Sequence, residues 1–152
     1  MSAREGSVKL NTKNTDRTKH ELYENDILTN VGARSVYEHG RRIGFCVNIR
    51  INYYRGLPLS CLDYIVLTVD GETARPEDMI VRCSGKEYPY LHILSDDMET
   101  DTYWLFGDYL RVTVLRAGGI EPGRHEVTLN LGVRRSYTPT LESSCTKTLT
   151  FA

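Results

Sequence analysis

The chain of 152 residues has the length of one domain, and its 40% of hydrophobic residues is ordinary for a globular protein. Its formal net charge of −1, without a basic stripe, argues against a nucleic-acid surface as the main function. No stretch is long and apolar enough to cross a membrane, and the N-terminus lacks the apolar segment of a secretory signal, so we expect a cytoplasmic protein.

Residues 1–30 are polar and show no clean period, so they are expected to form a mobile or partner-ordered extension. A single short strand near Ile27 and Leu28 is one option within this extension. The packed domain is therefore expected over residues 31–152. It would begin with a short strand at residues 34–37 and a turn at residues 38–42.

The clearest strand of the sequence begins at Phe45. Apolar residues alternate with polar ones as far as Tyr53, which is typical of a strand with one buried face. Cys46 falls on the polar face of this strand and need not belong to the core. The sequence has four cysteines without a C-x-x-C pair or zinc-like spacing, and in a cytoplasmic protein we expect free thiols rather than disulfides.

Period-two alternation between turn residues predicts many more short strands. These are expected at residues 65–69, 79–83, 86–94, 103–106, 110–114, 125–133 and 147–151. Pro89 would place the third of these at a sheet edge, Asp70 and Gly71 predict a tight turn, and residues 74–78 predict a loop or one helical turn. The fold class is therefore all-β, a single-domain antiparallel β-sandwich.

Residues 52–60 form the richest loop of the sequence. Gly56 can adopt a positive φ, and Pro58 fixes its own φ and favours an extended Leu57, so this loop is expected to be stiff. Tyrosine and arginine are enriched at interface hot spots, and a preformed loop loses little entropy on binding. The loop could therefore bind a partner, or it could fold back to cap the domain's own core.

Residue types that carry chemistry are present but do not form a recognisable catalytic set. The acidic residues Asp96, Asp97, Glu99 and Asp101 lack the spacing of a calcium loop and fit a solvated loop better. The histidines are scattered, and His125 lies on the apolar face of its predicted strand, where a satisfied or interface side chain is expected. We predict no metal ligand and no catalytic residue in this chain, which fits an accessory role.

Trp104 and Tyr103 could form a platform for stacking on a sugar ring. The alternative is that they belong to the sandwich core, because large aromatic side chains dominate burial. We favour the core for this pair.

Five segments of the sequence occur in a characteristic order. The most specific is Tyr53-Tyr54-Arg55-Gly56-Leu57-Pro58-Leu59-Ser60. The others are residues 69–72 (Val-Asp-Gly-Glu), 118–127 (Gly-Gly-Ile-Glu-Pro-Gly-Arg-His-Glu-Val), 136–139 (Ser-Tyr-Thr-Pro) and 147–150 (Lys-Thr-Leu-Thr). Together they resemble the small β subunit of bacterial C-glycoside deglycosidases, and the resemblance covers the chain from about Arg41 to the C-terminus.

The resemblance implies one of two subunits of a hetero-oligomeric C–C lyase. The α subunit of such enzymes is similar to sugar-phosphate isomerase barrels, carries the catalytic groups and binds a divalent metal ion, which we expect to be Mn²⁺. The substrate class is a 3-oxo sugar joined through carbon to a flavonoid or other aromatic aglycone. On this view no cofactor is bound by the β subunit itself.

Within the resemblance, residues 53–59 are the candidates for the subunit interface and the active-site rim. They are Tyr53, Tyr54, Arg55, Gly56, Leu57, Pro58 and Leu59. Tyr54 and Arg55 are expected to make polar contacts, the two leucines and Pro58 to form an apolar plug, and Tyr137 is a further rim candidate. The alternatives are a carbohydrate-binding module and a structural interaction domain without a catalytic role.

Overall fold

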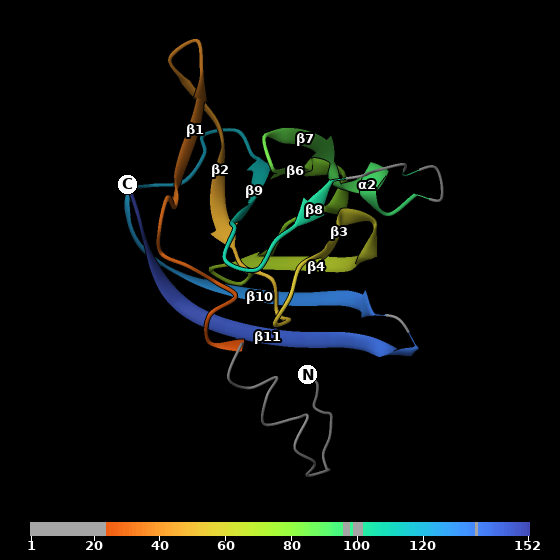
Figure 1. Cartoon of the computed structure of the whole chain (residues 1–152). Coiled ribbons are helices and arrows are strands. Elements are labelled where there is room, and N and C mark those ends of the chain that lie inside the picture. The colour runs from red at the N-terminus through yellow and green to blue at the C-terminus, as the bar shows by residue number, and fades with distance from the viewer. Residues whose placement is uncertain (1–23, 96–97, 99–101, 136) are drawn as a thin grey trace.

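The computed structural model describes residues 24–95, 98, 102–135 and 137–152, and strands dominate this part of the chain. Two antiparallel sheets pack face to face, and a small third sheet lies at their side (Figure 1). The predicted all-β sandwich is confirmed. The acidic cluster Asp96, Asp97, Glu99 and Asp101 lies outside the described residues, as does the extension up to residue 23.

The first sheet has five strands in the order β1-β2-β9-β6-β7. Their bounds are Arg34–Glu38 (β1), Arg41–Ile49 (β2), Leu110–Leu115 (β9), Met79–Cys83 (β6) and Lys86–Pro89 (β7). The predicted strands at residues 34–37, 79–83 and 110–114 are confirmed, and β7 lies at a sheet edge as Pro89 predicts.

The second sheet has four strands in the order β11-β10-β4-β5. Their bounds are Thr138–Phe151 (β11), Gly123–Arg135 (β10), Leu62–Val69 (β4) and Glu72–Thr73 (β5). The small sheet pairs β3 (Leu57–Pro58) with β8 (Tyr103–Trp104). The described helical turns are η1 (Leu59–Cys61), η2 (Pro76–Asp78) and α2 (Tyr90–Ile93).

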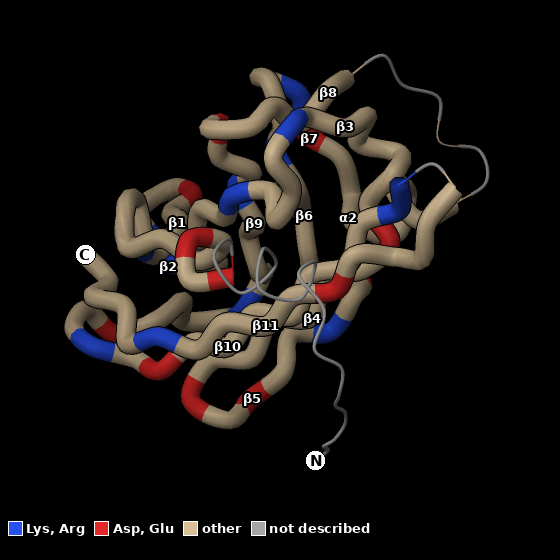
Figure 2. Tube along the Cα trace, turned by 60° about the horizontal axis from the view of Figure 1, so that its bottom comes forward, with Lys and Arg blue, Asp and Glu red and all other residues tan. Residues whose placement is uncertain are grey.

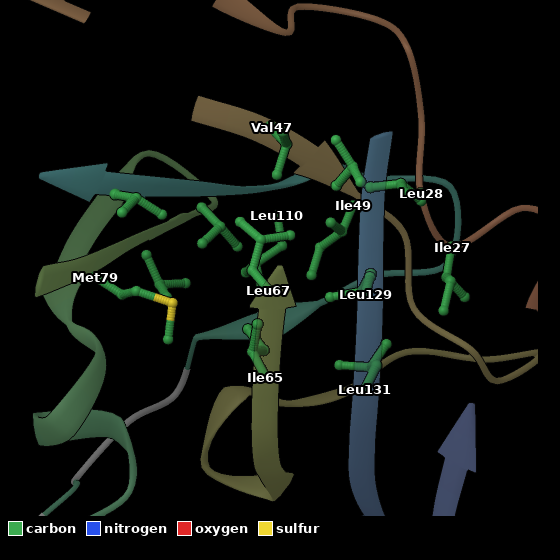
Figure 3. Packing of buried hydrophobic residues seen from close by; sticks show 14 of the residues in the cluster. Ile27, Leu28, Val47, Ile49, Ile65, Leu67, Met79, Leu110, Leu129 and Leu131 are labelled. Atoms are coloured by element: carbon green, nitrogen blue, oxygen red, sulfur yellow. The ribbon is translucent and has the colours of Figure 1, made fainter. Parts of the chain in front are cut away.

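The core lies between the two main sheets and follows the period-two pattern of their strands. Alternate residues of β4 and β10 point inward, so Ile65 and Leu67 meet Leu129 and Leu131 across the pair, and all four are buried (Figure 3). Val47, Ile49 and Leu110 close the same cluster from the five-stranded sheet. Burial of each such side chain contributes about 1.5–3 kcal/mol to stability.

The prediction of one exposed face on the Phe45 strand is wrong. β2 ends at Ile49, and the backbone of Val31 and Gly32 contacts the side chains of the face that was expected to be polar. The Asn48 carbonyl accepts the Thr29 amide at 3.3 Å, and the Asn48 Nδ2 donates to the Val31 carbonyl at 2.9 Å. Cys46 is consequently only 1% exposed, although it stands outside the main core cluster.

The packed domain also begins earlier than residue 31. Ile27 and Leu28 are fully buried, and Leu28 forms a bridge with Ile49. Side chains of this segment bind the free edge of β11: Glu24 accepts the Ser144 amide at 2.8 Å. A strand edge bonded in this way is less able to pair with another chain.

Three predicted elements have different bounds in the structure. The predicted strand at residues 86–94 turns into α2 after Pro89, because the Tyr90 hydroxyl points inward and accepts the Ile65 amide at 2.9 Å. The predicted strand at residues 103–106 stops at Trp104, whose indole Nε1 donates to the Asp108 carbonyl across a turn. The last strand starts at Thr138 rather than Lys147.

Two expectations about individual side chains are confirmed. Trp104 is 2% exposed and belongs to the core, so its indole is not a sugar platform. The expected core position is wrong for its neighbour Tyr103, which is 49% exposed because successive strand residues point to opposite faces. All four cysteines are free thiols.

Candidate functional site

The 52–60 loop is fixed to the sandwich at its start by Asn52. This side chain is fully buried, and its Nδ2 donates to the Leu141 carbonyl at 3.2 Å and to the Ser143 hydroxyl at 3.0 Å, both on β11. Ile51 before it is buried as well. The loop is therefore tied to the core directly before its two tyrosines.

The loop is fixed again at its end by pairing with β8. Leu57 lies opposite Trp104 and Pro58 opposite Tyr103, and the Leu59 amide donates to the Thr102 carbonyl at 2.9 Å. A Cβ atom on Gly56 would lie 2.9 Å from the Trp104 carbonyl oxygen, so this close approach of two backbones requires glycine. Both ends of the loop are thus held, and its geometry is set by the fold.

The predicted site residues differ widely in exposure. Tyr54 is 57% exposed and Arg55 is exposed, whereas Tyr53, Gly56, Leu57 and Pro58 are half-buried. Leu59 is 1% exposed and belongs to the core cluster, so it has no exposed surface with which to extend an apolar plug. Tyr137, at the turn between β10 and β11, is fully exposed and has a φ of 61°, which non-glycine residues rarely adopt.

Four side chains of this region form a continuous stack. The guanidinium carbon of Arg135 lies 5.6 Å from the Tyr53 ring centroid, and the Tyr53 and Tyr54 rings are 4.5 Å apart at 59°. The guanidinium carbon of Arg55 lies 5.9 Å from the Tyr54 ring. We call these residues the Arg–Tyr stack. Such cation–π contacts hold long arginine side chains in defined positions.

Contacts within the Arg–Tyr stack shift the pKa values of two of its members. The hydrogen bond with Tyr54, followed by burial, raises the pKa of Tyr53, and the hydrogen bond with Tyr54 raises the pKa of Arg55. Tyr53 is therefore not prepared to act as a base in this conformation. The stack carries two positive charges and two hydroxyl groups, which suits recognition rather than proton transfer.

An apolar flank beside the loop was missed by the sequence reasoning. Tyr103, Leu105 and Phe106 are 49%, 50% and 54% exposed, and a Cβ atom on Gly56 would lie 3.1 Å from Leu105 Cδ2. The dense aromatic run at residues 103–106 was the available signal, but it does not say which members point outward. The structure turns only Trp104 inward.

Arg135 was also missed, because nothing local to its sequence relates it to a tyrosine 82 positions earlier (135 − 53 = 82). The pairing depends on the loop crossing to the end of the β10–β11 hairpin. A separate pair, Arg50 with its guanidinium carbon 5.2 Å from the Tyr109 ring, follows β2 and precedes β9. Tyrosine, arginine and exposed apolar side chains therefore occur together at the 52–60 loop and its flank, the composition typical of protein interfaces.

His125 is structural in this fold. Its Nδ1 lies 2.6 Å from Asp70 Oδ2, and its Nε2 lies 2.7 Å from the Glu121 carbonyl oxygen. Because both ring nitrogens face acceptors, the doubly protonated ring satisfies both contacts, and the Asp70 carboxylate raises the pKa of His125. The expectation of a satisfied histidine is confirmed.

A pocket of about 320 Å³ lies near the other end of β4, away from the 52–60 loop. It is lined by Phe45, Leu67, Val69, Glu72, Thr73, Ala74, Arg75, Asp78, Val114, Leu115 and Arg116. Its charged groups pair with one another: Arg116 lies 3.3 Å from Glu72, and Arg75 lies 3.0 Å from Asp78. Internal pairing leaves little charge for a ligand, so we do not favour this pocket as the site.

Two properties of the described residues bear on function. Their histidine, cysteine, aspartate and glutamate side chains form no group of three that could hold a metal ion. Their helices are too short to cross a membrane.

Comparison with known proteins gives a consistent result. The profile of a family described as "C-glycoside deglycosidase beta subunit" matches residues 23–137. A C-glycoside deglycosidase β subunit of Microbacterium trichothecenolyticum is 32% identical over 108 residues, which is 68% of this chain and 73% of the relative. A protein of the same name from Eubacterium cellulosolvens is 26% identical over 117 residues (76% and 78%).

A third relative carries a different substrate in its name. It is a 3'-dehydrocarminate deglycosidase β subunit of a Microbacterium species, 30% identical over 96 residues, which is 63% of this chain and 70% of the relative.

Proposed function

Because the chain belongs to the family of C-glycoside deglycosidase β subunits, we propose that it is the accessory half of a C–C lyase built from two different subunits. Its substrate would be a 3-oxo sugar joined through carbon to an aromatic, flavonoid-type aglycone. The observation that carries the proposal is the 52–60 loop: both ends are fixed to the fold, and the exposed Tyr54 and Arg55 lie between them. A rigid loop of this composition is suited to bind another protein.

The partner in this proposal is a barrel-type α subunit that carries the catalytic groups. The Arg–Tyr stack and the flank of Tyr103, Leu105 and Phe106 would lie against it, with Tyr137 at the end of the hairpin as a further contact. The half-buried Leu57 and Pro58 remain available for the apolar part of this contact. Leu59 does not, since it is buried in the domain's own core.

The chemistry divides between the subunits accordingly. A keto group at C3 of the sugar acidifies the C–H bond at C2, and a base of the α subunit takes that proton. A double bond then forms between C1 and C2 as the bond from C1 to the aglycone breaks, and the aglycone carbon, helped as a leaving group by a phenol of its ring, takes up a proton. The residues of this chain would shape the pocket and exclude water. A divalent metal ion, expected to be Mn²⁺, is assigned to the α subunit. The described residues of this chain offer no group of three His, Cys, Asp or Glu side chains that could hold it.

A free-standing carbohydrate-binding module is supported less well. Such a module exposes an aromatic platform, but Trp104 is 2% exposed and donates its indole N–H to the Asp108 carbonyl. The family match also speaks against a structural domain unrelated to glycoside turnover.

The test is reconstitution of activity. The chain is expressed with the barrel protein encoded beside it, and aglycone release from a 3-oxo C-glucoside is followed for the pair and for each protein alone. Activity only in the pair supports the proposal, and full activity of the barrel protein alone would overturn it. Tyr54→Ala is expected to reduce the activity of the pair, whereas Tyr37→Ala, at an equally exposed tyrosine of β1 (59% against 57%), should leave it unchanged.

A further inference from the structure

The two arginines of the Arg–Tyr stack have no carboxylate partner among the described residues, in contrast to the adjacent Arg134. Arg134, next in the chain to Arg135, donates to the Ser60 carbonyl at 2.6 Å and lies 3.9 Å from Asp63. Arg135 instead donates to the Pro139 carbonyl at 3.2 Å and faces Tyr53. Two adjacent arginines of β10 thus differ: Arg134 lies near a carboxylate of the fold, and Arg135 does not.

We infer that the α subunit presents carboxylates to Arg55 and Arg135, and that these two arginines make the association of the two proteins electrostatic. The inference rests on the proposed function and specifies the chemistry of the partner. Arginine offers planar sets of N–H donors that match a carboxylate, so a stacked arginine without an acid is a ready receptor for one.

The stack prepares both arginines for this contact before the partner arrives. Arg135 lies on one tyrosine and Arg55 on the other, and the two rings contact each other, so the guanidinium groups are held as one unit. Arginine side chains lose rotamer freedom when they bind. Groups that are already positioned lose less, which strengthens and speeds association.

The charge distribution favours a protein partner over a nucleic acid. Lysine and arginine are spread over many elements in Figure 2, and the whole chain has a net charge of −1. A phosphate backbone needs a stripe of positive charge, which two arginines do not supply. The neighbouring Tyr103, Leu105 and Phe106 are about half exposed, and a protein face with apolar and acidic residues would cover both features together.

The salt dependence of association between the full-length chain and its α subunit tests the inference. We expect the dissociation constant of the wild-type pair to rise about tenfold between 0.05 and 0.5 M NaCl, because salt screens charge pairs at an interface rim. Arg55→Gln and Arg135→Gln should each weaken binding about tenfold at low salt, and the double variant should lose most of the salt dependence. Arg124→Gln, an exposed arginine near the other end of β10, is the control and should bind as the wild type does.

The possible results separate the two proposals. If the wild-type pair forms but neither salt nor the two substitutions change its affinity, the interface is apolar and the inference is overturned, while the accessory role stands. If the wild-type chain does not bind the α subunit under any salt condition, both proposals fail. Thermal melts of the variants alone, expected within a few degrees of wild type, confirm that a loss of binding is not a loss of folding.

Discussion

The contact between Asp70 and His125 should make stability depend on pH, and Asp70→Asn isolates its contribution. Asp70 occupies the Asp-Gly turn after β4 with a φ of 50°. Asparagine tolerates this conformation at least as well, so the substitution keeps the turn and removes only the charge. The Asp70 side chain also accepts the Glu126 amide at 3.0 Å, a bond that the asparagine oxygen can keep.

The direction of the pH effect follows from the two pKa shifts. Asp70 raises the pKa of His125 above the ordinary 6.5, so the stabilisation is complete below about pH 6.5 and is lost as pH rises through the folded-state value. His125 and the Glu126 amide lower the pKa of Asp70 below 3.8, so this contribution is present above pH 4 and is lost as pH falls further. The pair should therefore stabilise most between about pH 4 and 6.5.

The expected magnitude is about 1 kcal/mol at pH 6. A hydrogen bond to a charged group contributes roughly 1.5–3 kcal/mol, and we reduce this because the Asp70 side chain is 52% exposed to screening solvent. Urea unfolding of the wild type and the variant from pH 5 to 8.5 measures the difference. The difference should shrink as pH rises through the raised pKa of His125, because the ring then loses its charge. A difference that is constant across this range would refute the charged-ring assignment.

Three further predictions concern stability and thiol access. Gly44→Ala should lower the free energy of unfolding, measured in urea, by about 3 kcal/mol, because the new Cβ atom would lie 2.1 Å from the Val114 carbonyl oxygen of β9. A loss below about 1 kcal/mol would contradict the tight packing of β2 on β9. Asn52→Ala should cost about 2 kcal/mol in the same assay, since two buried groups of β11 lose their donor; an unchanged midpoint would show that the loop is not fixed there. A thiol reagent at neutral pH should modify Cys61 first in the native protein. Burial raises the pKa of the other three thiols, which are Cys46, Cys83 and Cys145. Equal rates of modification at all four cysteines would contradict the fold.

The parts of the fold that the sequence predicts well are those where one pattern decides the outcome. β4 and β10 alternate cleanly because each has one face on the core. Most of the described turn positions with a positive φ are glycines, and the others are His39, Asp70, Ser84 and Tyr137. For β11, the sequence predicted only the last part, residues 147–151 of Thr138–Phe151. Its first half turns Leu141, Ser143 and Cys145 inward, a small and partly polar set that does not look like a core face. That face can be polar because Asn52 bonds to it.

In the candidate site, too, the sequence indicates features that depend on neighbouring residues and misses features that depend on strand pairing. The composition of the 52–60 loop is local, so the loop could be identified from the sequence. Its stiffness comes from the contacts at its two ends, and Gly56 is required by its close approach to Trp104 rather than by the expected positive φ. The neighbours of the loop could not be identified in this way, because the approach of Arg135 to Tyr53 and of Leu105 to Gly56 depends on which strands pair. The burial of Leu59 has the same origin: the loop returns to the core through η1, which no local pattern indicates.

Within the loop, structural duties and recognition can be assigned to different residues. Asn52 fixes the start, Gly56 permits the close approach to β8, and Leu59 fills the core, so the fold itself explains these three. The fold gives no comparable reason for Tyr54 and Arg55, whose side chains are largely exposed. Under the proposed function, these two exposed side chains, which contribute little to the core, would contact the partner. We therefore expect Tyr54 and Arg55 to be positions at which binding can be changed without unfolding the domain.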